Sequence, residues 1–173
     1  MDALEVLMEE HGIILKTINV LNKSVEKLQE RKNISPEFFE KLLNITTNFT
    51  DKCHHGNEET ALFPLIKERD PKQDKVISQL LEDHKKGRTF VRALSESVDK
   101  NDFEGIIDNA KCYAKLLLLH IKKENAIFPI WINSLSEKNR ELLEKFEEIE
   151  EKVIGLGRHE EYIRNIERLK DYL

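Results

Sequence analysis

The chain contains the stretch His55-Gly-Asn-Glu-Glu-Thr-Ala-Leu-Phe-Pro64 and repeats its pattern as His120-Ile-Lys-Lys-Glu-Asn-Ala-Ile-Phe-Pro129. Both copies read His-x3-Glu-x3-Phe-Pro. On an α-helix, residues four apart lie on the same face, so each copy directs an imidazole and a carboxylate the same way. Two such pairs inside a helical bundle would supply two nitrogen ligands and two potentially bridging carboxylates. This is the ligand set of a dinuclear non-haem metal site.

The rest of the sequence favours an all-α fold. Charged residues make up 35% of the 173 residues, whereas there are only six glycines and four prolines. Apolar residues recur at three- and four-residue spacing in four long segments, which are residues 2–31, 36–69, 71–99 and 102–133. Because the connections between them are short, we expect an up-down-up-down four-helix bundle over residues 1–134, followed by a helical extension over residues 135–173.

Composition also argues against several classes of partner and location. The formal net charge is −5 and the charges are interleaved, so the clustered basic residues that bind nucleic acid are missing. The acidic N-terminus does not resemble a signal peptide, and the apolar run Leu116–Leu119 is far too short to cross a bilayer. Cys53 and Cys112 suit a reducing compartment better than a disulfide framework. We therefore expect a soluble cytoplasmic protein that binds neither nucleic acid nor membrane.

One histidine interrupts the apolar stripe of each long segment. These residues are His11, His55, His84 and His120. Successive helices are antiparallel, so we count the residues from each histidine to the break that joins its helix to the next. For two successive helices these counts differ by only a few residues, which amounts to a few Å at about 1.5 Å per residue. The four imidazoles are therefore expected to converge on one cross-section of the bundle.

Buried carboxylates at the same level require compensation. An ionised carboxylate in a bundle core costs several kcal/mol unless it is paired, and metal ions remove that penalty. A lone histidine in an apolar stripe is more often a core residue than a ligand, but four at one level with two glutamates reverse this preference. The hypothesis therefore assigns six metal ligands: His11, His55, Glu59, His84, His120 and Glu124.

A second pair with the same spacing, His54 and Glu58, lies one position earlier and overlaps the first copy of the repeat. Counting back from Phe-Pro in both copies aligns His55 with His120 and Glu59 with Glu124. His54 and Glu58 would then be rotated by about 100° on an α-helix. This prediction places them at the surface or behind the ligands.

Two further residues have open assignments. Tyr113 lies seven residues before His120 and is either a core tyrosine or a hydroxyl close to the metals. Arg88 lies four residues after His84 and could face the same way.

The sequence resembles the hemerythrin-like, or HHE cation-binding, family. The matching segments are Glu9-Glu-His11, Cys53-His-His-Gly-Asn-Glu-Glu-Thr-Ala-Leu-Phe-Pro64, Glu82-Asp-His-Lys-Lys-Gly-Arg88 and His120-Ile-Lys-Lys-Glu-Asn-Ala-Ile-Phe-Pro129. The resemblance implies a four-helix bundle that holds two iron ions. By this analogy Glu59 and Glu124 bridge the ions, His11 and His55 bind one, and His84 and His120 bind the other.

The sequence departs from the oxygen-carrying members of that family at one position. Those proteins use a fifth histidine four residues after the position of His84, where this chain has Arg88, which cannot bind a metal. The resemblance therefore implies a more symmetrical site with an additional solvent-open position.

Three classes of function are compatible with such a site. The first is a module that binds or senses a small diatomic ligand such as oxygen or nitric oxide. The second is an enzyme that reduces peroxide or nitric oxide, although the sequence shows no flavin, haem or iron–sulfur motif that would donate electrons. The third is a protein that stores or donates iron or repairs iron centres.

Overall fold

The structure is a computed structural model that describes residues 2–155 and 159–173, and these residues are almost entirely helical. The α-helices are α1 (Ala3–Gln29), α2 (Pro36–Asn44), α3 (Phe63–Arg69), α4 (Asp74–Asp99), α5 (Phe103–Ser134), α6 (Asn139–Val153) and α7 (His159–Leu169). Two π-helical segments, η1 (Ile45–His55) and η2 (Glu58–Leu62), lie between α2 and α3. Short 3₁₀ turns are η3 (Pro71–Gln73), η4 (Ser136–Lys138) and η5 (Lys170–Tyr172). The expected all-α class is confirmed.

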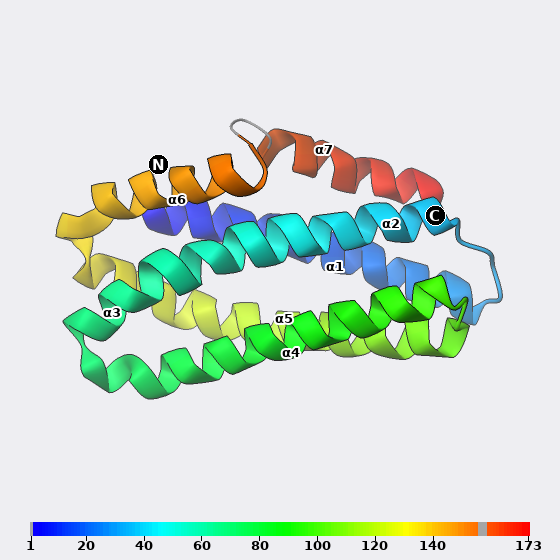
Figure 1. Cartoon of the computed structure of the whole chain (residues 1–173), viewed down its shortest axis with the longest axis horizontal. Helices are drawn as coiled ribbons and strands as arrows, with labels where there is room; N and C mark the ends of the chain where they lie inside the picture. The colour runs from blue at the N-terminus through cyan, green and yellow to red at the C-terminus, as the bar shows by residue number, and fades with distance from the viewer. Residues whose placement is uncertain (1, 156–158) are drawn as a thin grey trace.

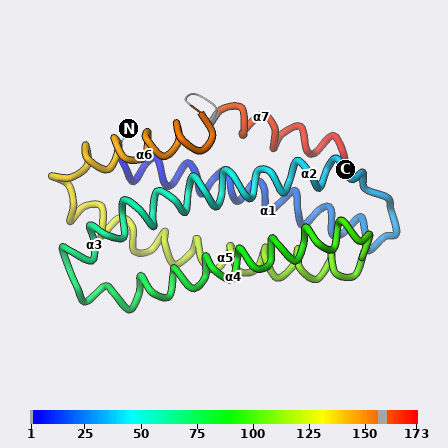
Figure 2. The backbone as a smooth tube through the Cα atoms, in the orientation of Figure 1, coloured from blue at the N-terminus to red at the C-terminus, as the bar shows by residue number. Residues whose placement is uncertain are grey.

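Four long helical segments lie side by side along the long axis of the molecule (Figures 1 and 2). They are α1, the continuous segment from α2 to α3, α4, and α5. Figure 2 shows that the connections between successive segments lie alternately at one end of the molecule and at the other. The helices α6 and α7 follow one another along the outside, on the side of α1 and α2 that faces away from α4 and α5 (Figure 1).

Local sequence explains where the long helices begin. Asp2 accepts a hydrogen bond from the backbone of Glu5, and the Glu5 carboxylate accepts one from the backbone of Asp2, which forms a capping box for α1. Ser35 caps α2 directly before a proline at the first helical position. Asp102 caps α5 by accepting from the backbone of Gly105. These side chains satisfy backbone N–H groups that have no partner within the helix.

The helix from α2 to α3 is wound more loosely than its neighbours. In η1 and η2 the backbone hydrogen bonds have the π pattern, which spans five residues rather than four and places more residues in each turn. Neighbouring residues are therefore separated by a smaller rotation than in an α-helix. Within the first copy of the repeated motif this winding includes His55 and the segment Glu58–Leu62, whereas the second copy lies in the α-helix α5.

Two hydrophobic clusters fill the core on either side of a polar layer. One contains Ile14, Leu21, Phe49 and Leu117, together with Ile166 from α7. The other contains Leu7, Phe63, Phe128 and Trp131, together with Phe146 from α6. Full burial of such a side chain contributes about 1.5–3 kcal/mol relative to exposure. The helices after residue 134 thus share the core of the first four segments.

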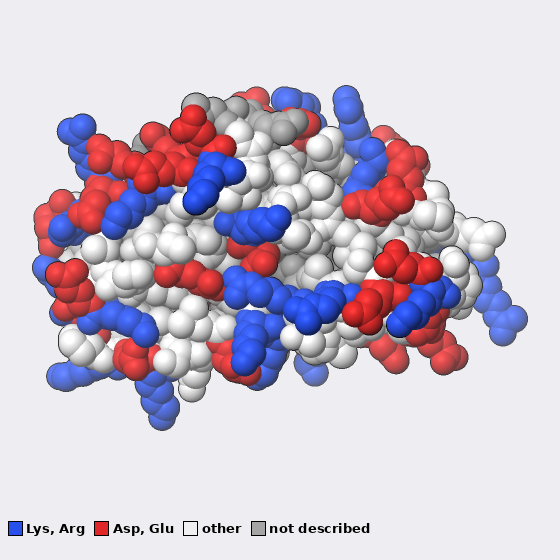
Figure 3. Space-filling model, in the orientation of Figure 1, with Lys and Arg blue, Asp and Glu red and all other residues white. Residues whose placement is uncertain are grey.

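Acidic and basic side chains alternate over the face shown in Figure 3, without a broad patch of either sign. Within the part of the chain that the structure describes, no helix combines the length and apolar character that a bilayer span needs.

Candidate metal centre

The polar layer between the two hydrophobic clusters consists of histidine and glutamate side chains from four helices. The helix α1 supplies His11, α4 supplies His84, and α5 supplies His120 and Glu124. The π-helical segments supply the remaining three, His54, His55 and Glu58. All seven side chains are at most 3% exposed.

Glu58 lies between histidines of two different helices. Its Oε1 atom is 3.2 Å from the Nε2 atom of His54, and its Oε2 atom is 3.1 Å from the Nε2 atom of His84. The two oxygens of one carboxylate therefore face two different imidazole nitrogens.

Glu124 repeats this arrangement with the other two histidines. Its Oε2 atom is 3.2 Å from the Nε2 atom of His11, and its Oε1 atom is 2.8 Å from the Nε2 atom of His120. Each glutamate thus spans the same two sides of the layer. We call these the first side, with His11 and His54, and the second side, with His84 and His120.

These inward atoms lack ordinary hydrogen bonds. Among the described residues, the Nε2 atoms of His11 and His54 and both carboxylate oxygens of Glu58 and Glu124 are buried without a hydrogen-bond partner. The contacts between these imidazole nitrogens and carboxylate oxygens are as short as ion pairs, but these atoms are not aligned as hydrogen-bond donor and acceptor. Buried polar atoms are rarely left in this state, because their desolvation costs about 1–3 kcal/mol each or more for charged groups. Two metal ions would satisfy all of them.

The outward nitrogen of every ring is held by an oxygen. The pairs are His11 with Asn125 at 2.7 Å, His54 with Glu10 at 2.8 Å, His55 with Asp51 at 3.3 Å, His84 with Glu59 at 2.7 Å, and His120 with Asp83 at 3.4 Å. Since these oxygens accept, each Nδ1 atom donates a proton to its partner, and Nε2 is the nitrogen directed into the layer. Metal-binding histidines show this same pattern, in which an outer acceptor fixes the tautomer and the ring orientation.

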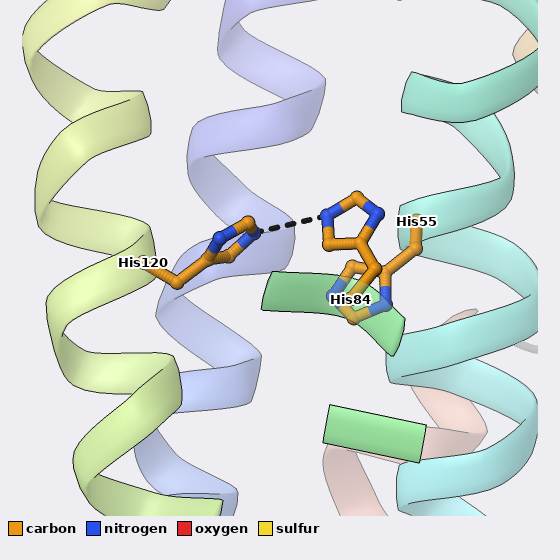
Figure 4. Close-up of side chains that lie close together, drawn as sticks. All are labelled: His55, His84 and His120. Atoms are coloured by element: carbon orange, nitrogen blue, oxygen red, sulfur yellow. Dashed lines mark hydrogen bonds between the residues drawn. The ribbon is translucent and has the colours of Figure 1, made fainter. Parts of the chain in front are cut away.

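His84 and His120 show why the second side requires a cation. Their Nε2 atoms lie 3.0 Å apart, as the dashed line in Figure 4 marks. Because each Nδ1 atom donates to a carboxylate, two Nε2 lone pairs face each other unless a proton or a metal ion lies between them. Nitrogen ligands of a single metal ion commonly approach each other to about 3 Å.

The charges of the layer depend on one another. Burial opposes charge on His84 and His54, but contacts with Glu124, Glu58 and Glu59 raise the pKa of His84 to about 11, and Glu58 and Glu10 raise the pKa of His54 to about 10. Burial and the neighbouring Glu124 oppose ionisation of Glu58, yet His54 and His84 lower its pKa to about 2.

The same interactions lower the pKa of Glu124 well below its usual range, against the effect of burial, through His11, His120 and His84. Ionised carboxylates in this layer therefore demand positive charge. In the metal-free protein, protons on the imidazole rings supply this positive charge. Bound metal cations would supply it instead and would displace those protons.

Five of the six ligands expected from the sequence converge in this layer, namely His11, His55, His84, His120 and Glu124. Glu59 does not join them. Its side chain is 26% exposed, and its Oε1 atom accepts hydrogen bonds from His84 Nδ1 at 2.7 Å and from Arg88 at 2.8 Å. Glu59 therefore lies behind His84, on the side away from the layer.

The sequence placed His54 and Glu58 at the surface or behind the ligands, and the surface position is wrong. His54 is 1% exposed and Glu58 is fully buried, and both belong to groups of side chains that could hold a metal. The reason is the π winding of η2, which adds one residue between the inward glutamate and Phe63. Glu58 precedes Phe63 by five residues, whereas Glu124 in the α-helical copy precedes Phe128 by four.

The π winding also alters how the histidines are paired. His54 groups with His11, Glu58 and Glu124, whereas His55 groups with His84 and His120. The family resemblance had implied that His55 pairs with His11. Because a π-helix rotates less per residue, both adjacent histidines face the interior, and the layer contains five imidazoles rather than four.

Arg88 and Tyr113 lie beside this layer. Arg88 donates from Nε to Asp51 at 2.8 Å and from a terminal nitrogen to Glu59 at 2.8 Å, so it supports the acceptors of His55 and His84. Tyr113 is 3% exposed, and burial together with the charge of Asp51 raises the pKa of its hydroxyl.

Sequence reasoning missed the outer acceptors. The most buried of them is Glu10, which is 2% exposed and accepts from both His54 and the side-chain amide of Asn57. Only Asp51 carried a sequence signal, since it lies four residues before His55. The partners Glu10, Asp83 and Asn125 depend on contacts between helices, which spacing along the chain does not reveal.

Comparison with known proteins was made against family models, curated proteins and solved structures. Residues 2–131 match the model of the hemerythrin HHE cation binding domain. The chain belongs to this family. The searches of curated proteins and of solved structures gave no match. The hemerythrin HHE match covers the four long helical segments except the last three residues of α5, and it includes every side chain of the polar layer, so the buried histidines and glutamates lie in a cation-binding domain.

Proposed function

We propose that this protein is a non-haem di-iron protein that binds or senses a small ligand such as oxygen or nitric oxide. Residues 1–134 form an up-down-up-down bundle around the two ions, and residues 135–173 form a helical extension. The observation that carries the proposal is the geometry of Glu58 and Glu124, each of which faces one histidine of either side with a different oxygen. This arrangement suits two bridging carboxylates.

The proposed ligand set follows the structure rather than the repeat counted along the chain. His11 and His54 bind one ion, His84 and His120 bind the other, and Glu58 with Glu124 bridges them. Glu59 becomes the residue that orients His84.

Iron is the metal that best fits these donors and this fold. Mixed imidazole and carboxylate ligands suit iron, and carboxylate-bridged iron pairs recur in the cores of four-helix bundles. Among the described residues, no cysteine belongs to the groups that could hold a metal. A bound iron pair would supply redox chemistry and a place for a diatomic ligand.

The chain itself controls access to the ions. Phe63 and Phe128 pack against the rings of His84 and His11, with centroid separations of 6.0 Å in both cases. These aromatic side chains belong to the hydrophobic cluster at one end of the layer and exclude water there. A small uncharged ligand such as oxygen or nitric oxide is compatible with such surroundings.

The test is anaerobic reconstitution with ferrous iron, followed by elemental analysis and visible spectra under argon, oxygen and nitric oxide. We expect about two iron equivalents per chain and a distinct spectral change with at least one of the gases. A single equivalent at saturation, or spectra that neither gas alters, would overturn the proposal.

The alternative in which the protein stores or donates iron is less well supported. Ligands that release metal readily are expected to be accessible, whereas every proposed ligand is at most 3% exposed. Transfer of iron to a chelator within minutes would favour storage, donation or repair. An enzyme that reduces peroxide or nitric oxide is favoured by a pocket beside the second side, and consumption of either substrate with an artificial electron donor would reveal it.

A further inference from the structure

The outward surfaces of α1 and α5 carry lysines without acidic neighbours in their own helices. Neither residues 12–23 of α1 nor residues 109–123 of α5 include an aspartate or a glutamate, although 33 residues of the chain are acidic. The exposed lysines of these two stretches are Lys16, Lys23, Lys111, Lys115, Lys122 and Lys123. We call the surface that they form the lysine face.

The fold brings the two stretches together. Asn22 of α1 lines a hollow with Lys111, Lys115 and Leu118 of α5, so the two stretches lie side by side. In Figure 1 both helices lie behind α2 and α4, and the lysine face is therefore not the face drawn in Figure 3. The expectation that the protein binds no membrane rested on interleaved charges along the sequence, and that interleaving does not extend to this face.

Large apolar side chains project from the same face. Leu15 is 39% exposed, Leu118 is 45% exposed and Leu119 is 53% exposed. They are three of the five large apolar side chains that are exposed among the described residues. Leu119 lines hollows on both sides of α5, and lysines line both of these hollows as well. The face thus combines exposed leucines with positive charge.

Most of this positive charge is not neutralised within the chain. The Nζ atom of Lys123 lies 2.7 Å from a carboxylate oxygen of Asp83. The other five lysines of the face form no ion pair among the described contacts. A cluster of roughly four to eight basic residues beside exposed apolar side chains is typical of a surface that binds anionic lipids.

The composition of the lysine face favours a bilayer over a protein or a nucleic acid. Residues 12–23 and 109–123 contain no arginine, and their one aromatic residue besides His120, Tyr113, is buried. Arginine, tyrosine and tryptophan dominate protein interfaces, where lysine is depleted. Nucleic acids are bound largely through arginine and through aromatic stacking. Lysines around leucines instead suit charged headgroups that overlie hydrocarbon.

We propose that the lysine face docks on the surface of an anionic phospholipid bilayer. Leu118 and Leu119 enter the boundary between headgroups and acyl chains, and the surrounding lysines contact the lipid phosphates. The side chains of His11 and His120, on the same two helices, are buried and belong to the polar layer. Docking therefore leaves that layer intact, and the inference does not depend on the proposed di-iron function.

The first experiment measures cosedimentation of the full-length protein with two kinds of vesicle. One kind contains phosphatidylcholine alone, and the other contains equal amounts of phosphatidylcholine and phosphatidylglycerol. We expect binding to the mixed vesicles only, and we expect it to weaken as salt is added, because salt screens the lysine charges. Equal binding to both kinds of vesicle, or binding to neither, would overturn the inference.

Two double variants test whether the lysine face carries the binding. Each lysine near an anionic bilayer contributes about fivefold to binding, so Lys115→Gln combined with Lys122→Gln should weaken binding by at least about tenfold. Lys85→Gln combined with Lys152→Gln removes the same charge from exposed positions of α4 and α6, and should bind like the wild type. Equal losses in the two double variants would show that net charge, rather than this face, drives the binding.

A third double variant tests insertion of the leucines. Leu118→Ser combined with Leu119→Ser changes two exposed positions, so the fold should be retained. We expect several-fold weaker binding to the mixed vesicles with an unchanged dependence on salt. Unchanged affinity would contradict the insertion of these leucines into the bilayer.

Cys112 allows the orientation to be measured directly. It is exposed in α5 next to Lys111, whereas Cys53 is buried, so a fluorophore can be attached to residue 112 alone. Mixed vesicles should protect this label from a water-soluble quencher. A label on Thr60→Cys in a Cys112→Ala background should stay accessible, since Thr60 is exposed on η2. Protection of residue 112 by a DNA duplex or by concentration-dependent dimerisation, without protection by vesicles, would replace the bilayer with a nucleic acid or a second copy of the chain.

Discussion

The Oε2 atom of Glu58 in η2 lies 3.1 Å from the Nε2 atom of His84 in α4, so that the contact links two successive helical segments of the bundle. The other oxygen of Glu58 faces His54 at 3.2 Å. A single side chain thus connects the two sides of the polar layer. Glu59, its neighbour in sequence, instead holds the outward nitrogen of His84.

Substitution of these two glutamates should have different effects. Glu58→Ala removes a bridging carboxylate, so we expect the protein to lose two-iron binding. Glu59→Ala should keep two irons with an affinity reduced by about 10–100-fold, the usual cost of losing an outer partner. Metal titration followed by elemental analysis measures both. Full loss from Glu59→Ala with intact binding by Glu58→Ala would restore the assignment made from the sequence repeat.

His54→Ala should reduce the iron content to about one equivalent. The variant leaves His11 as the only histidine of the first side, whereas His84, His120 and both glutamates of the second side are intact. Mössbauer spectra of ⁵⁷Fe-loaded protein would show one iron environment in place of two. If the variant retains two equivalents with wild-type affinity, His54 is not a ligand.

The thermal stability of the metal-free protein should decrease as the pH rises. The pKa of His54 increases from 6.5 to about 10 in the folded state, and that of His84 to about 11. A raised pKa contributes stability that is fully present below 6.5 and is lost as the pH passes through the folded value. We therefore expect the melting temperature to fall between about pH 7 and pH 11.

Metal loading provides the control for this pH dependence. A bound ion keeps its charge as the pH rises, so the loaded protein should show a smaller decrease over the same range. In His54→Gln the metal-free protein should also lose less stability between about pH 8 and pH 10. Identical slopes for the metal-free and loaded wild-type protein would show that protons on these histidines do not compensate the carboxylates.

Arg88→Ala should lower metal affinity without altering stoichiometry. Arg88 binds Asp51 and Glu59, which hold the outward nitrogens of His55 and His84. Because it is partly exposed, the expected loss is modest, about tenfold, and Arg88→Lys should recover part of it. Competition with a chromophoric chelator measures the affinity. Loss of an entire iron equivalent would mean that Arg88 contacts the metal site directly.

Much of the fold could be predicted because it depends on local signals. Apolar spacing identified the four long segments, and the helix starts at Ser35 and Asp102 coincide with capping residues. The level of the histidines could also be predicted, since it depends only on helix rise and antiparallel packing. His11, His84 and His120 accordingly meet in one layer.

The rotational phase of the second helix could not be predicted in the same way. Counting at 100° per residue assumes α-helical hydrogen bonds, but η1 and η2 adopt the π pattern. Such π turns are rare and occur frequently at functional sites, so a count at the α-helical period does not anticipate them. Counting at the α-helical period therefore placed Glu59 inward and His54 outward, whereas the structure buries Glu58 and His54; His120 and Glu124, in the α-helical copy, are buried as expected.

The π winding of η2 has a consequence for how insertions and deletions would be tolerated. In three dimensions the equivalent of His120 and Glu124 is His54 and Glu58, and the first copy carries one additional residue before its Phe-Pro pair. Deleting Thr60 should therefore relax this turn to α-helical winding and leave Glu58 four residues before the phenylalanine, with metal binding retained. Deleting Ala126 from the already α-helical copy should rotate Glu124 relative to Phe128 and abolish two-iron binding. The two motifs are thus expected to differ in their tolerance of length change although their sequences look alike.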